Sequence, residues 1–218
     1  MVIGIAIAIL ITEVKNIKLK KLYQSAILLP FLMSMVILSY IVYALLSAEN
    51  GLVNNSILPL FHMDPIQWYQ KPKYWPAILI IANCWKGVGY GCLIYIASLI
   101  GIDPSFYEAA RLDGASKWQE ITKITLPSLV PTIITLLLLS IGRIFYSDFG
   151  LFYQVPMNSG VLVSTTNVID TYVYRALIEQ GNISMSSAAG VYQSLVGFCV
   201  VMLSNWIVRK VDKDQALF

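Results

Sequence analysis

The polar residues best suited to act on another molecule gather in one stretch, Glu108–Pro131, which lies between two long apolar segments. Its sequence is EAARLDGASKWQEITKITLPSLVP. Residues 103–125, which begin just before this stretch and include most of it, carry the acids and bases Asp103, Glu108, Asp113, Glu120, Arg111, Lys117 and Lys123. In a chain that is mostly apolar, such a stretch has the chemistry to bind a partner.

Local signals predict that this stretch begins with a short helix. Asp103 is a good N-cap residue, and Pro104 follows at the first helical position, where its missing N–H costs nothing. The helix is expected to end near Leu112. Gly114 can adopt the left-handed conformation that terminates helices, so Asp113-Gly114 is predicted to form the turn.

A second short helix is predicted to begin after Ser116, with Gln119 completing a capping box. Pro127 is expected to end it near Thr125 or Leu126. One side of this helix is apolar and needs a surface to pack against. That side is formed by Trp118, Ile121 and Ile124.

The residues alone leave two interpretations of this helical hairpin open, one as a partner-binding element and one as a surface hairpin packed on the chain's own helices. A third interpretation, a DNA-binding helix-turn-helix, also has a Gly-bearing turn between two helices. It fails because acids outnumber bases here, so phosphates would gain nothing from binding.

A second set of polar residues lies inside apolar segments, where ionisable groups indicate a functional site by default. Asn83, Lys86 and Tyr90 share one helical face, which makes them candidates for such a site. Gly87 and Gly91 form a small-xxx-small pair that predicts tight helix packing. The alternative is that these residues have no functional role and only pack within the protein.

Arg143 is a further candidate for a functional site of this kind. An Arg at a helix centre costs roughly 3 kcal/mol on insertion scales. Seven Ile and Leu residues between Ile133 and Ile141, at about −0.5 kcal/mol each, offset that cost. The segment therefore inserts with or without a role for Arg143, which alternatively extends to the outer interface if the helix ends near Tyr146.

Composition shows which elements must hold these residues. Of 218 residues, 57% are hydrophobic and 12% charged, the net charge is +3, and the mean hydropathy is +0.70. A soluble domain cannot bury that much apolar surface, so we expect an all-α, polytopic membrane helix bundle. The predicted apolar segments are 1–11, 22–47, 76–100, 129–147 and 188–208, about five transmembrane helices in one domain over 1–210.

The first segment is too short to span a ~30 Å hydrocarbon core, and it lacks the flanks of a signal peptide. We therefore expect the first helix to be truncated at its N-terminus. Basic residues near 12–21 and after the last span place those regions, the 103–128 loop and the 211–218 tail on the cytoplasmic side. The basic residues are Lys15, Lys18, Lys20, Lys21, Arg209, Lys210 and Lys213.

The spacing within the hairpin resembles the EAA loop of permease subunits in type I ATP-binding-cassette (ABC) importers, the MetI-like family. The similar positions are Glu108, Ala109, Ala110, Gly114, Ile124, Leu126 and Pro127. Asp113-Gly114-Ala115 with Pro131 is similar to the carbohydrate branch, although that branch often has Phe where Ile121 stands. The runs GVGYGCLIYIASLIGIDPSFYEAARLDGA and VIDTYVYRAL look closest to permeases for oligosaccharides or polysaccharides.

The resemblance implies a multi-pass permease of the bacterial cell membrane that moves a sugar delivered by an external binding protein. It implies that Glu108, Ala109, Ala110, Asp113 and Gly114 form a turn that docks on cytoplasmic ATPase subunits. A second, related permease would complete the translocation path, which Asn83, Lys86, Tyr90 and Arg143 are candidates to line in this chain. Because the chain has no Gly-x4-Gly-Lys-Ser/Thr sequence, ATP and Mg are expected in the ATPase partners, and the chain itself is not expected to be an enzyme.

Other functions remain to be weighed. The same family carries non-sugar solutes, so a permease for such a solute is the alternative to a sugar permease. A secondary transporter would have internal repeats, none of which is evident. An intramembrane enzyme or a metal site would need clustered acids, Cys or His, but His62 is the only histidine and Cys84, Cys92 and Cys199 are scattered in apolar runs.

The segment from Asp170 to Arg175 is predicted to face outward. It either touches an external binding protein or covers the membrane surface.

Overall fold

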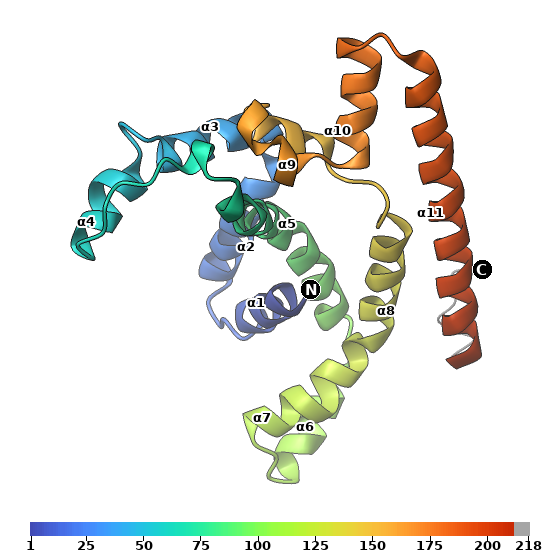
Figure 1. Cartoon of the computed structure of the whole chain (residues 1–218). Helices are drawn as coiled ribbons and strands as arrows, with labels where there is room; N and C mark the ends of the chain where they lie inside the picture. The colour runs from blue at the N-terminus through green and yellow to red at the C-terminus, as the bar shows by residue number, and fades with distance from the viewer. Residues whose placement is uncertain (212–218) are drawn as a thin grey trace. The chain divides into compact units, whose positions relative to one another are not determined.

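The computed structural model describes residues 1–211, which form α-helices joined by short turns and loops (Figure 1). No β-strand occurs in this part of the chain, as expected for an all-α protein. The helices are α1 Val2–Thr12, α2 Ile17–Leu32, α3 Met35–Leu46, α4 Leu58–Leu60, α5 Trp75–Ile100, α6 Pro104–Leu112, α7 Lys117–Glu120, α8 Leu126–Gly142, α9 Val163–Thr166, α10 Ile169–Tyr174 and α11 Ile183–Val211. Residues 212–218, most of the predicted cytoplasmic tail and including Lys213, lie outside the described residues.

Wider and tighter helical turns join or extend these helices. The π-helical segments are Val53–Ile57, Ile121–Thr125, Gly150–Gln154 and Arg175–Glu179. The 3₁₀ segments are Trp68–Gln70, Pro72–Tyr74 and Gly160–Leu162. Short helices therefore occupy much of the two long connections between the apolar segments, 48–75 and 148–187.

Three continuous helical stretches in residues 1–211 are long and apolar enough to cross a membrane: Pro72–Ile100, Lys117–Gly142 and Ile183–Lys210. The pair α2 and α3 makes a fourth if the two helices together form one span. Helix α1 is apolar but shorter. The five apolar segments of the sequence thus correspond to three full-length helices, one interrupted pair and one short helix.

The interruption lies at Met33–Ser34, inside the apolar segment 22–47. Ser34 begins α3 as its N-cap, because its hydroxyl accepts a hydrogen bond from the Ile37 N–H at 3.2 Å. Such a cap satisfies one of the N–H groups that a helix start leaves without a partner. Helix α2 contains Pro30 three residues before the break, and this residue is buried.

The chain divides into two compact units, each with its own apolar core. One unit contains, of the described residues, 1–32, 86–141 and 201–211, and its core is formed by Ala8, Ile11, Cys92, Tyr95, Ile96 and Leu129. The other contains residues 33–85 and 142–200, and its core is formed by Leu38, Val42, Trp75, Leu79, Ala82, Leu151, Val155 and Leu162. The division falls inside α5, between Trp85 and Lys86.

Within the first unit, Gly89 allows α2 and α5 to approach each other closely. A Cβ atom on Gly89 would lie 2.0 Å from the carbonyl oxygen of Ile27. A Cβ atom on Gly87 or Gly91 would meet nothing within 4 Å. The prediction of tight packing at Gly87 and Gly91 is therefore wrong within this chain, because helix rotation turns the glycine between them toward α2.

Candidate functional site

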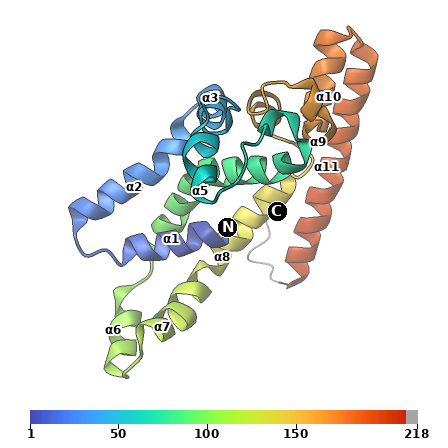
Figure 2. The same cartoon turned by 60° about the vertical axis from the view of Figure 1, so that its left-hand side comes forward.

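The polar stretch between residues 103 and 128 folds as a hairpin whose two arms, α6 and α7, lie side by side (Figure 2). The predicted start of the first arm is confirmed: the Asp103 carboxylate accepts a hydrogen bond from the Ser105 N–H at 2.9 Å. This bond lowers the pKa of Asp103 below its usual value. The predicted capping box of the second arm is also present, formed by Ser116 and Gln119.

The turn of the hairpin depends on Gly114. Its φ of 79° lies in the left-handed region that glycine adopts without strain. The Ala115 N–H bonds to the Ala110 carbonyl at 2.9 Å, which closes the end of α6 in the manner of a Schellman motif. A Cβ atom at Gly114 would meet nothing within 4 Å, so the backbone conformation, and not crowding within this chain, favours glycine here.

The second arm does not end at Pro127, so that prediction is wrong. Helical hydrogen bonding runs on from Lys117 to Gly142 through the π-helical segment Ile121–Thr125. In this wider turn the Leu126 N–H bonds to the Ile121 carbonyl, five residues back. A proline ring usually clashes with the carbonyl four residues earlier, and a π-turn is one way to accommodate it in a continuous helix.

Glu120 holds the two arms together. It is 3% exposed, and its carboxylate accepts hydrogen bonds from Arg111 Nε at 2.8 Å and Lys117 Nζ at 3.0 Å. Lys117 also pairs with Glu13, at the end of α1, at 3.1 Å. The bonds to Glu120 raise the pKa of the Arg111 guanidinium, so it stays charged. A further bond at 3.0 Å joins the Tyr107 and Thr125 hydroxyls.

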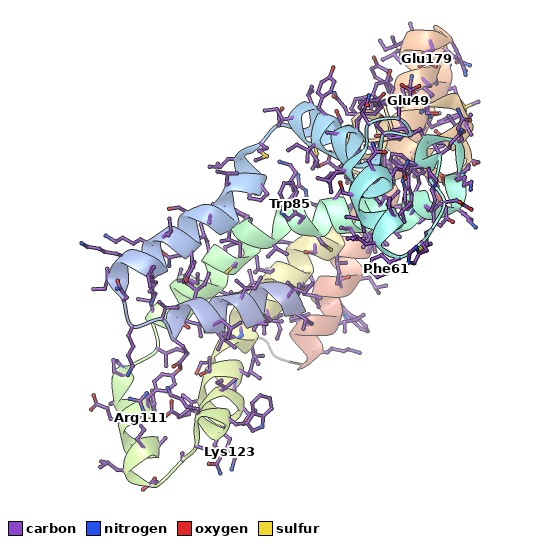
Figure 3. All side chains as sticks on the ribbon, turned by 90° about the vertical axis from the view of Figure 1, so that its left-hand side faces the viewer. Glu49, Phe61, Trp85, Arg111, Lys123 and Glu179 are labelled. Atoms are coloured by element: carbon purple, nitrogen blue, oxygen red, sulfur yellow. The ribbon has the colours of Figure 1, made fainter. Side chains whose placement is uncertain are left out.

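These ion pairs decide which charges the hairpin presents outward. Arg111 and Lys117 are occupied by Glu120 and Glu13, whereas no ion pair involves Glu108, Asp113 or Lys123 within the described chain. All three of these residues are exposed. Figure 3 shows Arg111 and Lys123 on the two arms.

A shallow hollow of ≈ 250 Å³ lies beside the turn. Its lining residues are Ala110, Asp113, Gly114, Ala115, Gln119, Lys123 and Ile124. It therefore brings together four of the residues predicted to couple to a partner. Of the others, Glu108 and Ala109 are exposed on α6, Leu126 is half-buried and Pro127 is exposed at the start of α8.

Large apolar side chains are exposed on this polar hairpin. Leu112 is 89% exposed and Trp118 is 72% exposed, and Phe106 is also exposed. Ile121 and Ile124, on the same predicted apolar side as Trp118, are only half-buried. On an element that carries so many charges, such side chains are suited to contact with another protein.

The hydrogen bonds that join Glu120 to Arg111 and Lys117 were not predicted from the sequence, which shows the three residues only as charges. The spacing of Lys117 and Glu120, three residues apart on one helix, was the available signal. The longer-range pairing to Arg111 depends on how the hairpin closes.

The residues predicted to line a transport path belong to both units, Lys86 and Tyr90 to the first and Asn83 and Arg143 to the second. Lys86 Nζ bonds to the Phe31 carbonyl at 2.9 Å and to the Pro30 carbonyl at 3.5 Å, at the C-terminal end of α2. The Tyr90 ring stacks on the Phe31 ring, with centroids 4.9 Å apart. Asn83 is exposed on α5, one turn before Lys86.

Arg143 comes directly after α8, which ends at Gly142. Its side chain is exposed, and its carbonyl accepts a hydrogen bond from the Tyr146 N–H at 2.9 Å. It therefore lies at the end of a helix and not in the middle of one. No group of three or more His, Cys, Asp or Glu side chains able to hold a metal ion occurs in residues 1–211.

Comparison with known proteins gives the family. Residues 1–213 match the sequence model of the binding-protein-dependent transport system inner membrane component. The polygalacturonan/rhamnogalacturonan transport system permease protein YteP of Bacillus subtilis is 33% identical over 97% of this chain, and the lactose transport system permease protein LacF of Rhizobium radiobacter is 32% identical over 76%. The matched regions make up 65% and 56% of the lengths of those two relatives.

The fold is also found in a solved structure. A chain of the bacterial alginate ABC transporter, solved in complex with an alginate pentasaccharide-bound periplasmic protein, has a TM-score of 0.90 and 33% sequence identity, with 97% of this chain and 72% of that chain covered. The MetI-like helical fold expected from the EAA-type loop is thereby confirmed. This protein is a multi-pass membrane protein and belongs to the family of binding-protein-dependent transport permeases, the inner membrane components of these systems.

Proposed function

We propose that this chain is a permease subunit of an ABC importer and forms half of a translocation path for a sugar or oligosaccharide. The observation that carries the proposal is the apolar exposure of the hairpin. Leu112 and Trp118 project from a charged element that the ion pairs of Glu120 hold in shape. Such a stiff element can transmit motion from an attached subunit to the membrane helices.

The proposed partner at the hairpin is a cytoplasmic ATPase subunit. The residues that we assign to this coupling are Glu108, Ala109, Ala110, Asp113, Gly114, Ile124, Leu126 and Pro127. Because Glu108 and Asp113 have no ion pair within the described chain, we expect the ATPase to present basic side chains opposite them. Two such subunits would bind the ATP and Mg, and the hairpin and C-terminus would face the cytoplasm.

The proposed solute is supported by the relatives, whose names refer to polygalacturonan, lactose and alginate. An external solute-binding protein would deliver it, and a second permease, related but distinct, would complete the path in the bacterial cell membrane. We keep Asn83, Lys86, Tyr90 and Arg143 as candidates for the path. Of these, Lys86 already donates hydrogen bonds to the Pro30 and Phe31 carbonyls of α2. It could contact a solute only if the solute replaced these carbonyls as its hydrogen-bond acceptor.

The test is co-expression with candidate ATPases and the second permease, followed by purification and uptake measurements in proteoliposomes. We expect Leu112→Glu and Trp118→Glu to abolish ATPase co-purification and ATP-driven uptake. Leu60→Glu is the matched control, because Leu60 is also highly exposed but belongs to a different connection. If association and uptake survive both hairpin substitutions, the docking proposal is wrong.

Two alternatives predict different results in the same system. A permease of this family for a non-sugar solute would need the ATPase but would take up no saccharide. A secondary transporter would take up solute as the purified chain alone, without ATPase or ATP.

A further inference from the structure

An aromatic cluster lies in the connection between α8 and α11. The Phe149 and Tyr153 rings stack with centroids 4.9 Å apart, and Tyr174 packs against both at 4.8 and 5.0 Å. All three rings are half-buried, so part of the cluster stays accessible. The wide π-helical turns Gly150–Gln154 and Arg175–Glu179 contain or adjoin these residues, and such turns often occur at functional sites.

Arg175 is fixed beside this cluster by neutral groups. Its Nη1 and Nη2 atoms donate to the side-chain oxygens of Asn167 at 2.7 Å and Asn158 at 3.0 Å. Its guanidinium carbon lies 6.0 Å from the centroid of the Tyr153 ring. Asn158 adopts a φ of 46°, a conformation that Asn tolerates better than most residues, and in it the amide oxygen reaches the guanidinium.

The positive charge of Arg175 has no carboxylate partner in the part of the chain that the structure describes. Glu179, labelled in Figure 3, lies at the far end of the same π-helical turn and makes no ion pair with it. The hydrogen bonds to Asn167 and Asn158 use two of the five N–H donors of the guanidinium, which leaves others to bind a ligand. A neutral donor would suffice if Arg175 only joined the two loops through its hydrogen bonds to Asn158 and Asn167. Its positive charge therefore points to a further role.

An aromatic face beside a fixed guanidinium matches the chemistry of an acidic sugar. The aromatic side chains can pack against the apolar face of a sugar ring. The guanidinium of Arg175 can bind the carboxylate of that sugar with charge-assisted hydrogen bonds. Burial, and then the neighbouring Tyr174, raise the pKa of Tyr153, so its hydroxyl stays protonated and able to donate.

We propose that Arg175 and Tyr153, with Tyr174, form a binding subsite for a uronate unit of the transported saccharide, on the connection that the charge pattern places outside the cell. This inference rests on the proposed transport function and specifies the class of solute. The subsite would receive the sugar before it enters the membrane path.

The test compares an oligogalacturonide with the same oligosaccharide after its carboxylates have been reduced to alcohols. Affinities are measured for the full permease–ATPase complex in lipid nanodiscs, without the solute-binding protein, so that this protein's own specificity does not contribute. We expect the complex to bind the acidic form about tenfold more tightly, the scale of one charge-assisted pair, and Arg175→Gln to remove that preference. Arg175→Lys should keep part of it.

Two control variants separate the charge from the loop contacts. Asn167→Ala removes one tie but keeps the cation, so most of the preference should remain. Lys73→Gln removes another outward cation, one that lies 4.8 Å from the ring of Tyr74, and should change nothing. Equal binding of the two oligosaccharides by the unmodified complex would overturn the subsite, and so would an equal loss of both in Arg175→Gln.

The same variants distinguish a sugar subsite from a protein-binding surface. If Arg175→Gln instead weakens only the association with the solute-binding protein, Arg175 contacts that protein and the sugar subsite is wrong. ATP-driven uptake of any saccharide by the unmodified complex tests the proposed transport function separately. The subsite can therefore fail while that function stands.

Discussion

The ammonium group of Lys86 donates a hydrogen bond to the carbonyl oxygen of Phe31 at 2.9 Å, across 55 residues of sequence. Phe31 lies in the last turn of α2, where carbonyl groups have no partner within the helix. The negative end of the helix dipole also favours a cation at this place. Lys86 therefore caps the C-terminal end of α2, just before the interruption between α2 and α3. This role explains why an ionisable group lies inside α5.

Replacing Lys86 with Met should destabilise the protein while keeping most of the side-chain volume. Loss of a hydrogen bond from a charged donor is expected to cost about 2 kcal/mol and to lower the thermal unfolding midpoint of the purified protein. Lys73→Met is the control, because Lys73 contacts only the Tyr74 ring in the contacts described. A Lys86→Met variant that is as stable as the control but fails in uptake would return Lys86 to the transport path.

Gly89→Ala should be far more harmful than the same change at Gly87 or Gly91. The new Cβ atom would lie 2.0 Å from a backbone oxygen of α2, which cannot move aside as a flexible side chain can. Overpacking of this kind costs about 1–3 kcal/mol or more. Gly87→Ala and Gly91→Ala meet open space and should be neutral or slightly stabilising, so the three unfolding midpoints provide an internal comparison. Equal midpoints would show that α2 and α5 do not cross at Gly89.

The features that the sequence predicted correctly are local ones. Asp103 with Ser105 and Ser116 with Gln119 interact within three residues, so spacing alone identifies both helix starts. Gly114 could be predicted for the same reason, since a left-handed turn depends on the conformation of one residue. The all-α membrane fold followed from composition and segment length, which do not depend on packing.

The features that were missed depend on contacts between distant residues. The break at Met33 lies in a uniformly apolar run, and the group that caps the end of α2 is Lys86, far along the chain. Which of three neighbouring glycines faces α2 depends on the rotation of α5, which sequence spacing does not give. The continuation of the helix through Pro127 likewise depends on a wide turn that no local signal announced.

Substitutions at Gly114 should separate backbone strain from loss of partner docking. Because a Cβ atom has open space there, the cost within this chain comes from the φ of 79°, about 1–2 kcal/mol for Ala and less for Asn, which tolerates this region. Stability should therefore fall in the order Gly, Asn, Ala. If the turn fits closely against an ATPase subunit, Gly114→Asn and Gly114→Asp should both abolish ATPase co-purification despite their near-normal stability. Co-purification that follows stability alone would contradict a close fit at the turn.

Glu120→Gln should loosen the hairpin, whereas Glu108→Gln should leave its shape intact. Glu120 is buried and accepts from both Arg111 and Lys117, so a neutral amide leaves two cations without a charged partner in the hairpin itself. Glu108 is exposed and makes no ion pair in the described chain. Limited digestion with trypsin, which cuts after Arg111 and Lys117, measures the difference directly.

We expect faster cleavage at both sites in Glu120→Gln, together with weaker ATPase binding, because the arms that present Leu112 and Trp118 would no longer be held in register. In Glu108→Gln cleavage should be unchanged, and any loss of ATPase binding would then come from the docking surface itself. Arg111→Met combined with Glu120→Gln should cost less than the sum of the two single changes, since both remove the same interaction. Additive effects, or identical cleavage of the two Glu variants, would mean that Glu120 does not organise the hairpin.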